Sequence, residues 1–567
     1  MKKSYFFLAC VICTLNLFAQ WSGDPVNGGT PVCIASTGEQ SKISVSDGSN
    51  GAIIVFESYD NNTGANDFYV QRINSAGQVQ WGNASTPKPV CITATEKYLS
   101  SAIPDGSGGI YISWVDYRNA PDGEIYMQHI NSTGNPVWAL NGVKVNNSSN
   151  PLREMYSSKL CSDGGTGVVI CWTESEYNTV TSLTTYSQVF VQKYNSAGTA
   201  LWSAGGVQIC TATGIRAAED LIPDGSNGAI ICFGDTRNSN QSANDEFDNI
   251  DIYAQRISST GALQWTTNGV AVNTQQFNQY PSNLFGQSFS SVSDGAGGVI
   301  LIFDDYTGDN NGPNNFFAQK LNASGARQWA AAGVPVCTAD SVKFLIKTVS
   351  DGAGGMVLFF NDNRDGLPNS SASYAQRVLN NGTVGWTTNG VKIIDDAGYF
   401  GSYGNDMTED GSGNYIFNWT DPSFILKAQK INNNGALQWG TTGKDICTNP
   451  DAFPFSGQAI KSNAGAAIIN WVDGRNATTA TDIYAAKISS SGVLEGAAAS
   501  TSYTTIANGN WNAPATWEGG IVPPAAADVT IRHTVIVTTN ASCKSLKVEK
   551  PAGSITVNTG VNLSVQQ

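Results

Sequence analysis

The chain has 567 residues, of which 13% are charged, and its formal net charge is −14 at pH 7. An acidic chain of this kind is repelled by phosphate backbones and by anionic lipid surfaces, so we expect neither a nucleic-acid partner nor membrane-surface binding. The 60 glycines indicate many tight turns, because glycine adopts the positive φ angles that such turns need. The composition therefore favours short strands joined by turns.

The N-terminal segment has the three parts of a secretory signal peptide. Two lysines follow Met1, an apolar stretch runs to Phe18, and the small residue Ala19 precedes the expected cleavage point. A lipoprotein signal ending at Cys10 is the alternative, but its apolar region would have about five residues, fewer than is typical of export signals. No later run has the roughly 18 apolar residues of a membrane span. We expect residues 1–19 to be removed and the mature chain to be secreted or held at the outer cell surface.

From residue 20 to about residue 500, one tryptophan-centred pattern recurs. Each copy has a turn, an apolar run that ends in an aromatic residue, a segment similar to Ile-Tyr-Ala-Gln-Lys, and a tryptophan. Seven of the turns are Asp-Gly turns, and their aspartates are Asp47, Asp105, Asp163, Asp224, Asp294, Asp351 and Asp410. The tryptophans are Trp81, Trp138, Trp202, Trp265, Trp329, Trp386 and Trp439. Glycine suits the tight hairpin, and four short strands per copy are typical of a propeller blade.

The eighth copy lacks its last strand, because Gly496 stands where the other copies have tryptophan. The missing segment is present at the other end, where Gln20-Trp21 is followed by Pro31-Val32-Cys33. A blade built from both chain ends closes a ring without an exposed sheet edge. We therefore predict an all-β fold: an eight-bladed β-propeller of four-stranded blades over residues 20–500, with the last blade completed by residues 20–34.

Several side chains recur with the repeat, and we interpret them as structural. The aromatic residue that ends the apolar run and the tryptophan are expected to pack between blades. An acid follows that aromatic by two residues, at Asp116, Glu174, Asp235, Asp305, Asp362, Asp421 and Asp473. A base follows the third-strand glutamine, at Arg72, His129, Lys193, Arg256, Lys320, Arg377 and Lys430. We expect acid and base on neighbouring strands to pair across the blade, and the glutamine to bond to backbone.

Nine cysteines follow the signal segment. Five of them occupy one equivalent strand position: Cys33, Cys91, Cys210, Cys337 and Cys447. Equivalent positions in neighbouring blades should lie too far apart for a disulfide, so we interpret these cysteines as small buried hydrophobic residues. Cys161 and Cys171, on two strands of one hairpin, are the one pair left open.

No catalytic constellation is visible, and we name no catalytic residue. After the signal segment the chain has two histidines, His129 and His533, which argues against a Ser-His-Asp triad or a histidine-rich zinc site. The best acidic candidates lie in loops of the fourth and fifth copies: Asp245, Glu246, Asp248, Asp304, Asp305 and Asp309. Clustered carboxylates are suitable Ca²⁺ ligands. A solvated loop explains the same residues more simply, so Ca²⁺ stays open and no other cofactor is expected.

The connection between the second and third strands is the most variable part of the repeat. All such connections open on one face of the ring, where binding residues are commonly added to a rigid scaffold. Their asparagine, serine, threonine, aspartate and tyrosine side chains suit a polar partner. That face is our candidate interaction surface, for a polysaccharide or a protein, on a chain that we expect to be monomeric.

A second module follows the repeat. Asn510-Trp511, Thr516-Trp517 and Pro523-Pro524 precede short alternating strands. These residues match a signature of β-solenoid modules in large secreted bacterial proteins, which the segment resembles. We predict a small β-solenoid or sandwich-like module over residues 501–567, incomplete because only a few rungs follow the signature.

The propeller copies resemble repeats in surface proteins that Gram-negative bacteria export by the type IX route. The resemblance is carried by the segments 471–476 (Trp-Val-Asp-Gly-Arg-Asn) and 482–485 (Asp-Ile-Tyr-Ala). Members of that group end in a sorting domain that we do not find here, which again predicts a shortened chain. The sequence favours a non-enzymatic binding or adhesion protein. The alternatives are a carbohydrate-active enzyme, a hydrolase or lyase using loop carboxylates, and a structural surface component.

Overall fold

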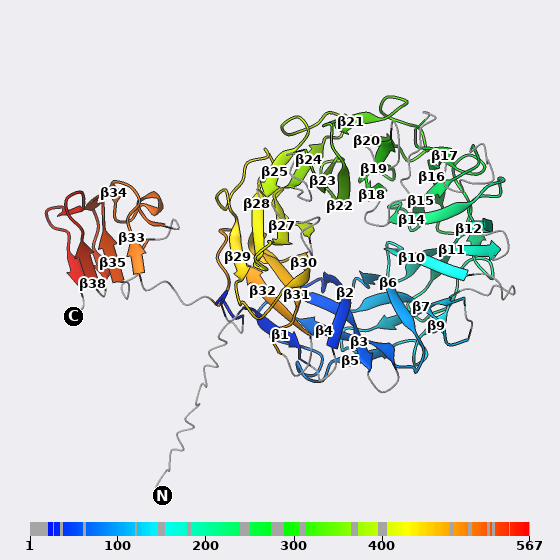
Figure 1. Cartoon of the computed structure of the whole chain (residues 1–567), viewed down its shortest axis with the longest axis horizontal. Coiled ribbons are helices and arrows are strands. Elements are labelled where there is room, and N and C mark those ends of the chain that lie inside the picture. Colours follow the sequence, from blue (N-terminus) through cyan, green and yellow to red (C-terminus); the bar gives the residue numbers. More distant parts are fainter. Residues whose placement is uncertain are drawn as a thin grey trace, which may run out of the picture. The chain divides into compact units, whose positions relative to one another are not determined.

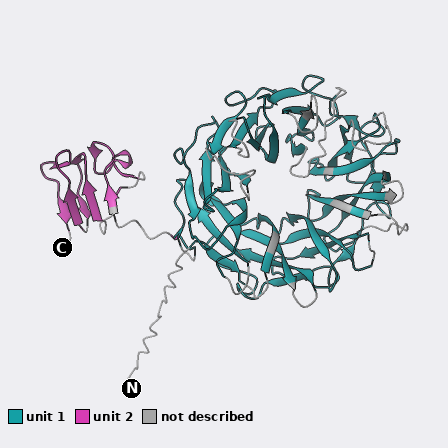
Figure 2. Ribbon diagram, in the orientation of Figure 1, with its two compact units in different colours: residues 1–495 teal, residues 496–567 magenta. Residues whose placement is uncertain are grey.

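The chain is all-β and forms two compact units, Met1–Glu495 and Gly496–Gln567 (Figure 2). The computed structural model describes residues 21–26, 28–34, 38–60, 64–119, 122–145, 154–178, 183–238, 250–273, 289–306, 313–364, 372–394, 405–476, 481–496, 502–518, 522–523, 528–543 and 545–565. No helix within these residues is long and apolar enough to span a membrane. The predicted signal segment lies outside them.

The first unit is a ring of eight four-stranded antiparallel sheets (Figure 1). Blade 1 contains β2 (Gly38–Ser46), β3 (Ala52–Asp60), β4 (Ala65–Ile73) and β5 (Lys88–Cys91). Blade 2 contains β6 (Lys97–Pro104), β7 (Ile110–Asp116), β8 (Glu124–Ile130) and β9 (Val143–Lys144). Blade 3 contains β10 (Glu154–Ser162), β11 (Val168–Asn178), β12 (Leu183–Tyr194) and β13 (Val207–Gln208). Blade 4 contains β14 (Arg216–Pro223), β15 (Ala229–Asp235), β16 (Asp251–Ile257) and β17 (Val270–Ala271).

The remaining blades repeat this order from the inner to the outer strand. Blade 5 contains β18 (Phe289–Ser293), β19 (Val299–Tyr306), β20 (Asn314–Leu321) and β21 (Val334–Cys337). Blade 6 contains β22 (Lys343–Ser350), β23 (Met356–Asp362), β24 (Ala372–Val378) and β25 (Val391–Ile394). Blade 7 contains β26 (Asp406–Glu409), β27 (Tyr415–Thr420), β28 (Leu426–Ile431) and β29 (Lys444–Cys447). Blade 8 contains β30 (Phe455–Lys461), β31 (Ala467–Asp473) and β32 (Asp482–Ile488), with a 3-10 turn at Asn463–Gly465.

The N-terminal strand closes the ring. β1 (Thr30–Cys33) pairs antiparallel with β32 of blade 8, with Thr30 opposite Ala485. Trp21 is buried, and its indole N–H donates to the carbonyl of Ser75 in blade 1 at 3.0 Å. The predicted eight-bladed propeller, with its last blade completed by the first strand, is therefore confirmed.

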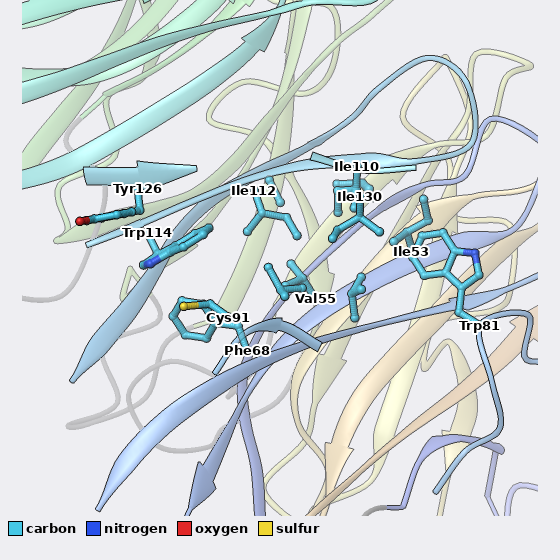
Figure 3. Close-up of a cluster of buried hydrophobic side chains, with 14 residues drawn as sticks. Ile53, Val55, Phe68, Trp81, Cys91, Ile110, Ile112, Trp114, Tyr126 and Ile130 are labelled. Atoms are coloured by element: carbon cyan, nitrogen blue, oxygen red, sulfur yellow. The ribbon is translucent and has the colours of Figure 1, made fainter. Parts of the chain in front are cut away.

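Aromatic and aliphatic side chains fill the space between neighbouring blades. Figure 3 shows this core between blades 1 and 2, where Phe68 meets Trp114 edge to face at 5.8 Å and Val55 and Ile112 lie beside them. Each fully buried side chain of this size stabilises the fold by about 1.5–3 kcal/mol. The recurring aromatic residues of the second strand are buried, as expected of core positions.

A glycine of each following blade fits against the repeat tryptophan. The Trp81 indole N–H donates to the carbonyl of Ser132 at 3.0 Å, and Gly134 lies under the ring with a φ of 79°. A Cβ atom on Gly134 would stand 2.6 Å from the Trp81 ring, so no larger residue fits. This close approach joins each blade to the next at the end of its third strand.

The acid–base pairs form within blades 1 to 7, but the predicted acid is wrong. His129 Nε2 lies 2.9 Å from Asp105, the aspartate of the Asp-Gly turn, and the other six bases pair in the same way at 2.7–3.3 Å. Strand register explains the difference: His129 is opposite Tyr111, whereas Asp116 is opposite Glu124. Five residues separate the two levels, roughly 17 Å along a strand. The glutamine bonds to backbone as predicted, since Gln128 donates to the carbonyl of Ala139 at 2.8 Å.

Asp116, the last residue of β7, pairs instead with Arg118, two residues later in the chain, at 2.5 Å. The Arg118 guanidinium also donates to Cys91 Sγ at 3.1 Å, across the interface with blade 1, and stacks over the ring of Tyr126 at 4.2 Å. The same arrangement recurs in the other even-numbered blades around Arg237, Arg364 and Arg475. Each of these arginines therefore joins its blade to the preceding one.

The nine cysteines after the signal segment are all buried and free. The five equivalent cysteines behave as small core residues, as expected. Cys161 is opposite Val169 and Cys171 is opposite Lys159, so the two side chains of the open pair are not cross-strand partners and form no disulfide.

The second unit is built from parallel pairs of short strands. Its strands are β33 (Ser502–Thr504), β34 (Gly509–Asn510), β35 (Asp528–Ile531), β36 (Thr534–Val537), β37 (Ala541–Cys543), β38 (Ser545–Val548), β39 (Ser554–Val557) and β40 (Leu563–Val565). They form the sheets β33-β35-β38, β34-β36-β39 and β37-β40, with a 3-10 turn at Pro514–Thr516. Trp511 and Trp517 are buried in its core, with ring centroids 5.1 Å apart.

Candidate functional site

The structure describes only part of the acidic cluster that the sequence suggested. Asp245, Glu246, Asp248 and Asp309 lie outside the described residues. Asp305 belongs to β19, opposite Asn315, and its side chain is also outside the described part. Among the described histidine, cysteine, aspartate and glutamate side chains, no group of three or more is arranged to hold a metal ion.

Asp304, the sequence candidate that precedes Asp305, has a structural role. Its carboxylate is buried and accepts a hydrogen bond from the Asn314 side chain at 3.3 Å. Asn314 also donates to the carbonyl of Lys343 and accepts from the Lys343 backbone N–H. This group therefore joins blade 5 to blade 6.

A pocket of about 240 Å³ lies between blades 1 and 2 on the face that carries the second-to-third-strand connections. We call this the loop face, and the opposite face, with the Asp-Gly turns, the turn face. The pocket is lined by Tyr59, Gly64, Asn66, Glu96, Lys97 and Tyr98. Tyr59 and Asn66 are opposite each other in β3 and β4, and the other side comes from the chain that enters β6. Two successive blades are thus needed to form it.

Two exposed tyrosines give the pocket its aromatic surface. Tyr59 is 40% exposed and Tyr98 is 48% exposed. Tyr98 packs edge to face on Tyr117, which directly follows β7, with ring centroids 6.0 Å apart, and the Tyr117 N–H donates to the carbonyl of Glu96. The Tyr98 ring is therefore held while one side of it stays open to solvent. A phenol of this kind offers both an apolar face and a hydroxyl group.

A buried lysine forms the base of the pocket. The Lys97 ammonium donates to the carbonyls of Thr93 and Thr95, at 2.9 and 3.2 Å, and lies 3.3 Å from an Asp67 carboxylate oxygen. It also stands 5.9 Å from the centre of the Phe68 ring. Burial of a charge is tolerated when it is paired and hydrogen-bonded in this way. Lys97 therefore fixes the chain that carries Glu96 and Tyr98.

A buried glutamate orients the amide in the pocket. Glu57 accepts a hydrogen bond from the Leu99 backbone N–H at 2.8 Å and another from the Asn66 side chain at 3.3 Å. Burial raises the pKa of Glu57 above its ordinary value, against the effect of the Leu99 bond and of the Lys97 charge. Asn66 thus has a fixed direction, and the exposed Glu96 adds a carboxylate. The pocket can stack a ring and hydrogen-bond hydroxyl groups.

A larger cavity of about 410 Å³ lies on the turn face, beside Asp351 and Arg377. The Arg377 guanidinium is already engaged, because it pairs with Asp351 at 2.8 Å and donates to the carbonyl of Asn433 at 3.3 Å. Both contacts belong to the recurring blade structure. We therefore take the pocket of blades 1 and 2 as the candidate site.

The pocket residues were not among the sequence candidates. Tyr59, Glu96 and Tyr98 have counterparts in only some of the other copies, such as Tyr306, Glu154 and Tyr156, whereas the repeat analysis selects residues that nearly all copies share. One sequence signal for this site is a departure from the repeat pattern in the same copy. Blade 1 has Ser58 where the other copies have an acid two residues after the aromatic.

Fold and pocket together define an eight-bladed β-propeller with a polar-aromatic site between two blades. No protein-family model matches the chain, and no curated protein matches it. A solved polysaccharide lyase, described as an ulvan lyase, is similar at 11% identity with a TM-score of 0.42, covering 83% of this chain and 96% of that one. The BP39L lectin from Burkholderia pseudomallei is similar at 10% identity with a TM-score of 0.37, covering 74% and 100%. An α-L-arabinofuranosidase from Fusarium graminearum is similar at 9% identity with a TM-score of 0.33, covering 69% and 92%. Scores this low carry no argument about what this chain binds.

Proposed function

We propose that this chain is a binding or adhesion protein that holds a polysaccharide in the pocket between blades 1 and 2. The observation that supports this most is the pair of exposed tyrosines, Tyr59 and Tyr98, beside the oriented amide of Asn66. Sugar rings combine an apolar face with hydroxyl groups, so an aromatic surface next to amide and carboxylate groups matches them. Glu96 is the one exposed carboxylate among the lining residues, whereas glycoside hydrolysis usually needs two.

We also propose that the mature chain acts outside the cell as a monomer. The pattern of residues 1–19 supports export, and the repeat resemblance supports the type IX route. The second unit is, in this proposal, a β-solenoid module. Its parallel pairs support this, since β35 lies between β33 and β38 with Val529 next to Tyr503 and Leu546.

A polysaccharide array probed with the mature chain tests the binding function. We expect the wild type to bind at least one polysaccharide and the Tyr59→Ala/Tyr98→Ala variant to bind it about tenfold or more weakly, because two ring contacts of about 1 kcal/mol each are lost. Tyr98→Phe keeps the ring and should retain most of the affinity. Leu140→Ala, which truncates a side chain that is 78% exposed elsewhere, should bind like the wild type.

Three results would contradict the proposal. Equal binding by the wild type and the double tyrosine variant would exclude the pocket. A wild type that binds no polysaccharide would exclude the function. Release of shortened products by the wild type would favour a hydrolase or lyase.

A further inference from the structure

The loop face carries a second exposed aromatic group, between blades 7 and 8. Phe424 is 46% exposed and Phe453 is 53% exposed. Their rings pack edge to face with centroids 5.2 Å apart. A phenylalanine side chain has no polar atom that water can hydrogen-bond. The two rings cover only part of each other, so an apolar surface stays exposed to water.

Both phenylalanines occupy backbone conformations that cost energy. Their φ angles are 59° for Phe424 and 40° for Phe453, in the left-handed region that bulky residues rarely adopt. Strain of this kind persists where the surrounding structure enforces it, and it is common at functional sites.

Hydrogen bonds hold the backbone at both positions. The Asp421 carboxylate accepts the N–H groups of Ser423 and Ile425, both at 2.9 Å, and the Phe424 N–H donates to the Asp421 carbonyl. Next to Phe453, the buried Ala452 accepts the N–H of Gly474 at 2.6 Å. The Phe424 ring is therefore presented by a closed turn, and the Phe453 ring by a segment anchored to the chain after β31.

This aromatic pair occupies the same place in the repeat as the tyrosine pocket. Phe424 lies between the second and third strands of blade 7, as the Tyr59 side of the pocket does in blade 1. Phe453 lies two residues before Phe455, which is opposite Val472, just as Glu96 lies two residues before Tyr98, which is opposite Val115. Both sites thus join an odd-numbered blade to the next even-numbered one. They are separated by two blade positions on the same face.

The size and surroundings of the pair indicate its occupant. Two half-exposed rings offer far less area than the roughly 800 Å² per partner of a stable protein interface, which disfavours a second copy of the chain. One sugar ring has an apolar face of suitable size. Polar groups lie beside the Phe424 turn: the Lys427 ammonium is 3.9 Å from Asp421, the first residue of that turn, and 2.7 Å from Asp445. Such groups can hydrogen-bond the hydroxyls at the edge of a stacked sugar.

We propose that Phe424 and Phe453 form a second sugar-binding site, which stacks a flat sugar ring with equatorial hydroxyls from the same polysaccharide that enters the pocket of blades 1 and 2. The inference rests on the proposed function and adds a second contact to it. Two sites on one rigid ring bind one polymer with far higher affinity than either site alone, since the second contact becomes intramolecular. The loop face would then favour long chains over short fragments.

Calorimetry with short ligands separates the two sites. The probes are the hexasaccharides of β-1,4-glucan, β-1,3-glucan, β-1,4-mannan and β-1,4-xylan, titrated into four forms of the mature chain: the wild type, Phe424→Ala/Phe453→Ala, Tyr59→Ala/Tyr98→Ala and the combined variant. We expect two hexasaccharides per wild-type chain, one for each double variant and none for the combined variant. The parent polysaccharide should bind either double variant at least tenfold more weakly than the wild type. Phe424→Tyr keeps the ring and should behave as the wild type.

Each contrary result has a distinct meaning. One hexasaccharide per wild-type chain, unaffected by Phe424→Ala/Phe453→Ala, would overturn the second site and leave the pocket. One hexasaccharide per wild-type chain that Phe424→Ala/Phe453→Ala no longer binds, but Tyr59→Ala/Tyr98→Ala still binds, would overturn the pocket and leave the aromatic pair as the binding site. A wild type that binds none of the four probes would overturn both. Sedimentation of a wild-type dimer that Phe424→Ala/Phe453→Ala abolishes would show that a second copy covers the pair. Thermal unfolding of every variant confirms that it folds.

Discussion

The two faces of the propeller differ in how they hold several of their buried carboxylates. On the turn face, Asp105 accepts hydrogen bonds from the N–H groups of Ser107 and Gly109, both at 2.7 Å, and pairs with His129. Burial alone would raise the pKa of Asp105, but these bonds outweigh it and hold the pKa below its ordinary value. The Asp410 pKa is lowered in a similar way, against burial, by Lys430 and Asn414. Carboxylates on this face are fully engaged in the fold.

On the loop face, three buried carboxylates keep a proton more readily, unlike Asp116 and its equivalents, which pair with arginines. Burial and the neighbouring charge of Asp482 raise the pKa of Glu39 to about 8, and burial raises the pKa values of Glu57 and Asp251. The same face holds the exposed tyrosines and the strained Phe424. The turn face is therefore optimised for stability, whereas the loop face retains costly groups. A binding function at the loop face would produce this difference between the two faces.

Removal of a turn aspartate should have the largest effect. We expect Asp105→Ala to lower the free energy of unfolding by about 3–5 kcal/mol, because it leaves the buried His129, the buried Gly109 N–H and the part-buried Ser107 N–H without their acceptor. Urea unfolding followed by tryptophan fluorescence measures the loss. Asp340→Ala, which removes an exposed acid, should change stability by less than about 0.5 kcal/mol. A loss below 1 kcal/mol for Asp105→Ala would mean that the turn face is not the stabilising one.

The same contrast explains what could be predicted from the sequence. Recurrence identifies groups such as Trp81 and Asp105, which every blade needs, and so it predicts the ring and its closure. It does not show at which end of a strand a side chain lies. The sequence therefore predicts a pair between Asp116 and His129, whereas the structure pairs Asp116 with Arg118. Residues that bind a ligand need not recur, so Tyr98 resembles any surface tyrosine until folding places it beside Asn66.

The closure between blades 8 and 1 provides a test of the loop-face carboxylates. Glu39 is buried where its N–H donates to the carbonyl of Thr481 at 3.1 Å, beside Asp482. Because its pKa is higher in the folded state than in the unfolded chain, the folded state binds the proton more tightly. The stabilisation is complete below about pH 4 and is lost as the pH rises to about 8, by at most about 1.4 kcal/mol per pH unit.

Glu39→Gln should remove this dependence. We expect the thermal midpoint of the wild type to fall between about pH 5 and pH 8 more steeply than that of Glu39→Gln. Glu96→Gln, at an exposed carboxylate, should follow the wild type. Parallel curves for the wild type and Glu39→Gln would show that Glu39 is ionised in the folded protein throughout this range.

The smallest effect should come from relief of strain at Phe424. Glycine accepts a φ of 59° without the penalty of about 1–2 kcal/mol that other residues meet, and both Phe424→Gly and Phe424→Ala lose the ring. Phe424→Gly should therefore be about 1 kcal/mol more stable than Phe424→Ala, by urea unfolding. At Tyr98, inside strand β6, the order should reverse, with Tyr98→Gly about 0.5–1 kcal/mol less stable than Tyr98→Ala. If Phe424→Gly and Phe424→Ala are equally stable, the left-handed turn carries no strain. If Phe424→Gly is the more stable and both have lost the second hexasaccharide, the chain accepts a local cost to present an aromatic ring that binds sugar.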